Sequence, residues 1–294
     1  MNYIDLFTAY LYNEKKASEN TVESYIRDIT QFDSYCASKN ITDLTKVDNK
    51  SLAVYFEYLT GKGKSEATKS RIIASLRCFY RFLLSRGFCI SNPLDGVKSK
   101  KAERKLPDIL DANEIMLLLS QPNGSDYKSI RDKAMLELLY ATGIKVSELI
   151  DLSVNDVNLQ IGIIHLHNDK KERIIPIYPA AVKSISDYLL NVRPAIVLEA
   201  NEDRLFTNMT GQHMSRQGFW KIVKHYASEA GITKDITPHT LRHSFAAHLL
   251  ENGAKLTDIK EMLGHADLSS TQIYAQIIKN KYTSAYTKFH PLAR

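Results

Sequence analysis

The stretch "TPHTLRHSFAAHLL", residues 237–250, places two histidines and an arginine in the first turns of an amphipathic helix. Thr237 is a good N-cap, and Pro238 suits the first helical position because its missing N–H had no partner there. His239 and Arg242 stand three residues apart and therefore share one face of the helix. A helix N-terminus that carries an imidazole and a guanidinium is suited to holding a phosphate.

Two other interpretations of this helix are open. Its polar residues could be ordinary surface and capping residues. His239 and His243 also stand at i, i+4, as in a zinc-binding helix, but "HTLRH" lacks the glutamate of the HExxH pattern. The arginine between the two histidines would also repel a cation. We therefore expect neither a metal nor another cofactor.

The composition is that of a globular chain with a small excess of positive charge. Among 294 residues, Lys and Arg exceed Asp and Glu by 39 to 33, a formal net charge of +6 that suggests an anionic partner without requiring one. Cys36, Cys78 and Cys89 are too dispersed for a disulfide framework, which favours a reducing cytoplasm. No apolar run reaches the ~18–20 residues of a membrane span, so we expect no membrane partner.

The first hundred residues predict helices. Apolar residues recur at spacings of three and four over residues 18–40 and again over 66–87, where Gly87 is a stop signal. The second helix also carries basic residues, which form either a solvated surface or a face that contacts phosphates. The candidate DNA-binding residues of this helix are Lys69, Arg71, Arg77 and Arg81.

A basic linker divides the chain. Residues 92–108, "NPLDGVKSKKAERKLPD", contain two prolines, a glycine and no periodicity. They separate a helical domain at 1–91 from a second domain at 109–294. Within the second domain, residues 162–177 predict a β-hairpin with lysines at its tip. The expected fold is mainly α, with a small sheet in the C-terminal domain.

The chain after the hairpin is expected to be helical to its end, with breaks at Gly231, Gly253 and Gly264. His265 follows the last of these glycines, and Tyr274 lies nine residues later. In a chain with sixteen tyrosines, a tyrosine on a helix usually belongs to the core or to an interface.

Four motifs together resemble the tyrosine recombinases, most closely their Xer branch. They are "SENTVESYIRDI" at 18–29, "ATGIKVSEL" at 141–149, the helix at 237–250 and "LGHADLSSTQIYAQI" at 263–277. The resemblance covers essentially the whole chain, with the motifs in order. It implies a two-domain clamp that wraps DNA, built from a helical SAM-like core-binding domain and an α+β catalytic domain.

The resemblance also implies a reaction. Tyr274 would attack a DNA phosphate, form a 3′-phosphotyrosyl bond and release a 5′-hydroxyl, without metal or ATP. His239, Arg242 and His265 would bind the scissile phosphate and assist proton transfer. A lysine at the hairpin tip would be the general acid toward the leaving oxygen. Lys170 is favoured, because Lys171 belongs to a "KER" triplet that matches the family downstream of the catalytic lysine, which leaves Lys171 as a candidate DNA contact.

One residue departs from the family pattern. The family has its first catalytic arginine where this chain has Lys145, which keeps the charge and loses the bidentate fork. A DNA-binding homologue with weak or no catalysis is therefore the alternative function. A type IB topoisomerase uses similar residues, but the Xer-like N-terminal domain argues against it.

Double-stranded DNA and a synaptic tetramer, with or without a related second recombinase, are the expected partners. Three biological roles stay open: resolution of chromosome dimers in chromosome partition and the cell cycle, integration of a mobile element, and inversion of a segment.

Overall fold

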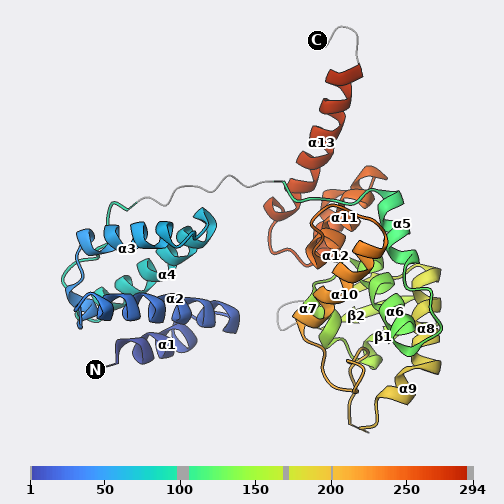
Figure 1. The fold of residues 1–294 in the computed structure, drawn as a ribbon, viewed down its shortest axis with the longest axis horizontal. Coiled ribbons are helices and arrows are strands. Elements are labelled where there is room, and N and C mark those ends of the chain that lie inside the picture. Colours follow the sequence, from blue (N-terminus) through green and yellow to red (C-terminus); the bar gives the residue numbers. More distant parts are fainter. Residues whose placement is uncertain (1, 98–105, 168–171, 200, 290–294) are drawn as a thin grey trace. The chain divides into compact units, whose positions relative to one another are not determined.

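The computed structural model describes residues 2–97, 106–167, 172–199 and 201–289 (Figure 1), except for most side chains beyond residue 280. The chain divides into two compact units, Met1–Arg104 and Lys105–Arg294. None of the helices in the described part of the chain is both long enough and apolar enough to cross a membrane.

The first unit is helical throughout. Ser18 precedes the second helix, and Ser65 caps the fourth by accepting a hydrogen bond from the backbone of Thr68. The predicted helices over 18–40 and 66–87 are confirmed. Their apolar stripes meet in a core rich in aromatic rings, to which the chain after the fourth helix adds Leu94. The elements are α1 (Tyr3–Asn13), α2 (Glu19–Ser38), η1 (Leu44–Lys46), α3 (Asn49–Gly61) and α4 (Glu66–Ser85).

The second unit combines helices with one small sheet. The elements before and within the sheet are α5 (Ala112–Ser120), α6 (Tyr127–Thr142), α7 (Val146–Asp151), η2 (Val154–Asp156), β1 (Val157–Asn158), β2 (Ile163–Leu166) and β3 (Arg173–Pro176). Those after it are α8 (Pro179–Asn191), α9 (Arg193–Ile196), α10 (Arg216–Glu229), α11 (Pro238–Glu251), α12 (Leu256–Leu263) and α13 (Ser269–Phe289). The mainly helical class with a small C-terminal sheet is thus confirmed.

The sheet contains the predicted hairpin and one further strand. β2 and β3 pair antiparallel with Ile164 opposite Ile175, and β1 adds to the free side of β2. The hairpin tip, and with it Lys170 and Lys171, lies outside the described residues. The expectation of helix to the end of the chain is wrong between α9 and α10, where the described residues form a loop with two isolated β-bridges.

Two hydrophobic clusters hold the second unit together. The larger one surrounds α6, which packs against α8 and α11. The smaller one joins α11, α12 and α13, which lie side by side in Figure 1. Its buried members are Phe245, Ala246, Ile259, Leu263, Tyr274 and Ile277. The candidate nucleophile is therefore part of a packed core.

Candidate active site

The site is built around the start of α11. Thr237 caps the helix through Thr240, and Pro238 occupies the first turn, as the sequence predicts. The ring of His239 is exposed, whereas Arg242 is only 5% exposed. The arginine thus points into the protein while the histidine borders the solvent.

Arg242 joins three segments that are distant in sequence. Its two terminal nitrogens donate to the carbonyl of Gly143, which ends α6, and to the carbonyl of Leu263, which ends α12, each at 2.6 Å. Hydrogen bonds from a charged donor are about twice as strong as neutral ones. The guanidinium therefore brings together the segments that lead to Lys145 and His265.

Gly143 has the backbone conformation and the space that only glycine fits. Its φ is +59°, in the left-handed region, and a Cβ atom built on it would lie 2.3 Å from the Phe245 ring. The close approach of Phe245 places α11 against the end of α6. It explains why the "ATG" motif ends in glycine.

Lys145 opens α7 with an exposed side chain. Its backbone N–H donates to Glu148 Oε2 at 2.8 Å, and the other oxygen of Glu148 accepts from Arg173 Nη2 at 2.5 Å. Arg173, on β3, also donates to the carbonyl of Met262 at 3.0 Å. This nearly buried arginine therefore ties the strand next to the hairpin tip to α7 and α12.

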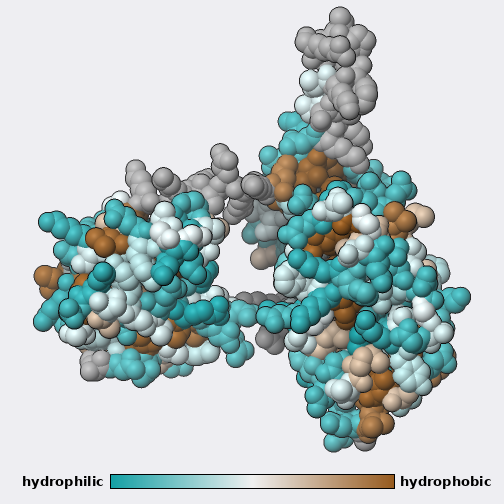
Figure 2. Space-filling view, in the orientation of Figure 1, coloured by the Kyte–Doolittle hydropathy of each residue, from teal (hydrophilic) through white to brown (hydrophobic). Residues whose placement is uncertain are grey.

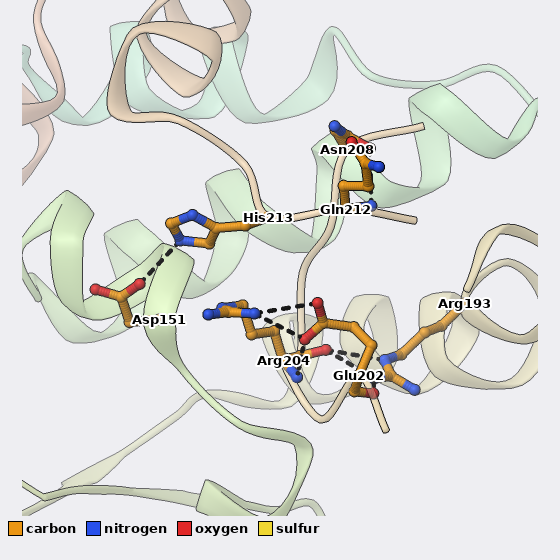
Figure 3. A network of polar contacts seen from close by, with 7 residues as sticks. All are labelled: Asp151, Arg193, Glu202, Arg204, Asn208, Gln212 and His213. Carbon is orange, nitrogen blue, oxygen red and sulfur yellow. Dashed lines mark hydrogen bonds and ion pairs between the residues drawn. The ribbon is translucent and has the colours of Figure 1, made fainter. Parts of the chain in front are cut away.

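The far end of α7 is held by a second polar network, shown in Figure 3. Asp151 and His213 lie 2.9 Å apart, which fixes the end of α7 to the loop before α10. In the same loop, Glu202 binds Arg204, and Arg193 donates to the carbonyl of Arg204. Both ends of α7, which Lys145 precedes as the N-cap residue, are thus anchored.

His265 and Tyr274 are each held by one side-chain hydrogen bond. The Nδ1 atom of His265 lies 3.0 Å from the hydroxyl of Thr271, in the first turn of α13. The hydroxyl of Tyr274 lies 3.0 Å from Nδ1 of His243, and the tyrosine is only 1% exposed. Two hydroxyl–imidazole pairs therefore dock α13 onto the site.

Burial and mutual repulsion keep the imidazoles of the site neutral. Burial, with the charge of Arg242 among the smaller causes, lowers the pKa of His243 and of His265 to about 4. Lys145 is close enough for its charge to contribute to the shift at His265. His239 is exposed, yet the protein atoms around its ring and then Arg242 lower its pKa as well.

The same factors act in opposite directions on the tyrosine. Burial raises the pKa of Tyr274, and the charge of Arg242 opposes that rise. The phenol is therefore protonated at neutral pH. It lies within the electrostatic influence of the guanidinium that we expect to bind phosphate.

The structure brings five of the six candidate catalytic residues into one region: Lys145, His239, Arg242, His265 and Tyr274. The sixth, Lys170, lies outside the described residues, as does Lys171. Among the described residues, no cluster of three or more metal-ligating side chains is present.

The candidate DNA-binding residues of α4 differ in their surroundings. Lys69 contacts Glu66 and donates to Thr60, and Arg77 donates to the carbonyl of Val97. Arg71 binds Asp28 Oδ2 at 2.7 Å. Arg81 is exposed.

Four residues of this region were not assigned to the site from the sequence: Glu148, Arg173, His243 and Thr271. Glu148 stands three residues after the N-cap position, the spacing of a capping box, which is a usable signal. The spacing of His243 from His239 suggests only a metal ligand. Arg173 stands in the "KER" triplet and Thr271 in the motif at 263–277, but neither pattern indicates their partners, because the fold brings those partners to them.

Known proteins match the chain along its whole length. The phage integrase family matches residues 108–281, and the N-terminal SAM-like domain of phage integrases matches residues 4–87. The chain is 40% identical to tyrosine recombinase XerD of Staphylococcus epidermidis, with 99% of both chains covered. It is 42% identical to XerD of Halalkalibacterium halodurans, over 99% of this chain and 98% of the relative.

Solved structures agree with this match. The crystal structure of XerA recombinase is 26% identical, covers 98% of both chains and superposes with a TM-score of 0.55. A XerH recombinase bound to its difH substrate, 23% identical, shares the fold with a TM-score of 0.78 over 93% of this chain and 81% of that one. The chain therefore belongs to the phage integrase family and is a Xer-like tyrosine recombinase, an enzyme of site-specific DNA recombination.

Proposed function

We propose that the enzyme attaches itself to DNA through Tyr274. The main support is the position of the Tyr274 hydroxyl among the cationic and imidazole groups of the site. It lies 3.0 Å from Nδ1 of His243, and the charge of Arg242 acts on it. A phenol with a pKa of about 10 is a weak nucleophile at neutral pH. Such surroundings favour its phenolate-like form as it attacks.

In the proposed reaction, Tyr274 Oη attacks the scissile phosphorus and the bond to the 5′-oxygen breaks. Arg242, His239, His265 and Lys145 hold the phosphate oxygens, on which negative charge builds in the transition state. The leaving 5′-oxygen takes a proton from Lys170, with Lys171 as the alternative donor. Since one phosphoester replaces another, rejoining is the reverse step and needs no ATP.

Double-stranded DNA at a specific site is the proposed substrate. The solved XerH relative is bound to such a substrate, which supports the proposal. On the first unit, we expect exposed Arg81 to contact phosphates, together with Lys69, Arg71 and Arg77 once they exchange their present partners. Such contacts release counterions, so binding will weaken steeply with salt.

We also propose assembly into a synaptic tetramer on DNA, alone or with a related second recombinase. A lambda integrase of the same fold is a tetramer bound to a Holliday junction. In this chain, Figure 2 shows hydrophobic residues gathered where α13 emerges from the rest of the second unit. A reducing cytoplasm is the proposed compartment, because all three cysteines are free thiols.

The alternative, a DNA-binding homologue with little catalysis, rests on Lys145 alone and is not favoured. A suicide duplex, nicked so that the cleaved strand diffuses away, tests the proposal. The wild type is expected to form a covalent adduct that maps to Tyr274 and forms equally in EDTA. Tyr274→Phe is expected to bind the duplex and form none. An adduct formed by Tyr274→Phe would show that another residue is the nucleophile, and Tyr282 is the nearest tyrosine in sequence.

A further inference from the structure

The contact between Tyr274 and His243 has a definite direction. A phenol carries one proton, and in the described part of the chain His243 Nδ1, at 3.0 Å, is the hydrogen-bond partner that the structure gives it. A buried hydroxyl without an acceptor is costly, so Tyr274 donates and His243 Nδ1 accepts. The proton of a neutral His243 then lies on Nε2. The unshared electron pair of Nδ1 points at the nucleophile.

His243 is ready to accept that proton at neutral pH. The groups that face it are His239 and Arg242 on its own helix, His265 after α12, and Tyr274 on α13. Burial first, and then the nearby positive charges, lower the pKa of His243 to about 4, which leaves the ring neutral. Because this makes it a weak base in the free enzyme, the tyrosine keeps its proton there. A bound phosphate adds negative charge to the same group of cations and strengthens the base.

The other two imidazoles of the site are placed differently. His265 Nδ1 is already hydrogen-bonded to Thr271 at 3.0 Å. His239 lies one turn before His243, with 6.4 Å between the ring centres, and its ring is exposed. Among the described histidines, His243 is the one whose ring nitrogen contacts the Tyr274 hydroxyl.

We infer that His243 is the catalytic base for the nucleophile. As Tyr274 Oη forms its bond to phosphorus, the phenolic proton moves to His243 Nδ1, and the bond between phosphorus and the 5′-oxygen breaks. When the strand is rejoined, the imidazolium returns the proton to Tyr274. This inference rests on the proposed role of Tyr274, and it assigns to His243 a task that the resemblance leaves among His239, Arg242 and His265.

His243→Asn tests the inference, because an amide oxygen can accept the tyrosine hydrogen bond but cannot take up the proton. In single-turnover cleavage of the suicide duplex, we expect the rate to fall by about 10²–10⁴-fold, the usual contribution of a general base. The wild-type rate is expected to level off once His243 is neutral. The His243→Asn rate should instead rise about tenfold per pH unit, because only ionised tyrosine then attacks.

A substrate with sulfur in place of the 5′-bridging oxygen distinguishes deprotonation of the nucleophile from protonation of the leaving group. A thiolate, with a thiol pKa of about 8.5, leaves without a proton. The defect of His243→Asn is expected to persist on this substrate, whereas that of Lys170→Ala should be suppressed. Suppression of the His243→Asn defect would place the residue on the leaving-group side and overturn the inference.

His248→Asn is the matched control. His248 is also on α11, and its Nδ1 lies 2.9 Å from the hydroxyl of Tyr140. Each variant therefore replaces with an amide an imidazole of α11 that contacts a tyrosine hydroxyl, and we expect the wild-type rate only for His248→Asn. If His243→Asn does not fold, His243→Ala with imidazole in solution replaces it, and recovery of the rate with imidazole is expected.

The outcomes separate this inference from the proposed function. An adduct at Tyr274 that forms at the wild-type rate and with the wild-type pH profile in His243→Asn would overturn the inference alone. An adduct that persists in Tyr274→Phe would overturn both. A folded His243→Ala whose lost rate imidazole does not restore also counts against the base.

Discussion

The hydroxyl of Thr271 lies 3.0 Å from Nδ1 of His265, and Thr271 is fully buried. Among the described residues, His265 Nδ1 is the acceptor available to the Thr271 hydroxyl. The threonine therefore donates, and the proton of neutral His265 lies on Nε2. Thr271 is thus positioned to set the tautomer of a residue expected to donate to the phosphate.

Thr271→Val, which keeps the shape and removes the hydroxyl, is expected to slow single-turnover cleavage by about two- to tenfold, the value of one lost hydrogen bond. Thr271→Ser should cleave within about twofold of the wild type. Nitrogen NMR of labelled histidine reports the tautomer directly. An unchanged His265 spectrum in Thr271→Val would show that another group sets the tautomer.

Gly143→Ala is expected to destabilise the protein by about 2–5 kcal/mol, the sum of a left-handed alanine and an overpacked ring contact. Gly231→Ala is the matched control, because its φ is +66° and no atom lies within 4 Å of the added Cβ. It should cost only about 1–2 kcal/mol. Urea unfolding measures both, and equal losses would mean that Phe245 moves aside freely.

Asp28 is a buried carboxylate that accepts hydrogen bonds from Arg71 and Ser75, each at 2.7 Å. Arg71→Ala is therefore expected to lower the stability of the protein by about 1–3 kcal/mol, because the carboxylate loses a charged partner. Arg81→Ala, on the same helix, should unfold like the wild type and weaken DNA binding. A stable Arg71→Ala variant would leave Arg71 with DNA contact as its main role.

Acid is expected to weaken the fold through the imidazoles of the site. In the unfolded chain histidines take up protons below pH ~6.5, whereas His243 and His265 stay neutral in the folded chain down to about 4. Their contribution to stability is therefore complete above pH ~6.5 and is lost as the pH falls toward 4. His265→Gln should lose less stability than the wild type between pH 7 and pH 5 in urea unfolding, and equal losses would contradict this account.

Lys145→Arg is expected to raise the cleavage rate with little change in DNA affinity. The positive charge is already present, and arginine adds a second donor to the phosphate in the transition state. One charge-assisted hydrogen bond contributes about 1.5–3 kcal/mol, or roughly ten- to hundredfold in rate. Single-turnover cleavage at matched occupancy is the measurement. An unchanged or slower rate would show that the pocket is adapted to lysine.

Local signals predicted the helices of this protein well. The cap at Thr237, the proline after it and the stop at Gly87 act within a few residues, so they can be read from the sequence. The loop between α9 and α10 was missed because contacts across the fold shape it. One of these is the pairing of Asp151 with His213, 62 residues apart.

The sequence proposes members of the candidate site but not the contacts that connect them. The motifs pointed to Arg242 and Tyr274, yet the partners of Arg242 lie 99 and 21 residues away in sequence. The contact of His243 with Tyr274 spans 31 residues. Such contacts follow from the packing of α11 against α6, α12 and α13, which no short pattern encodes.

The two carbonyls that hold Arg242 have a consequence for how this enzyme tolerates change. Both belong to the main chain, so no substitution of a neighbouring side chain can remove them while the ends of α6 and α12 keep their course. Surface residues elsewhere can therefore be altered, by drift or by design, without loss of the two contacts that hold Arg242. Retargeting such a recombinase should start from the residues outside these two helix ends.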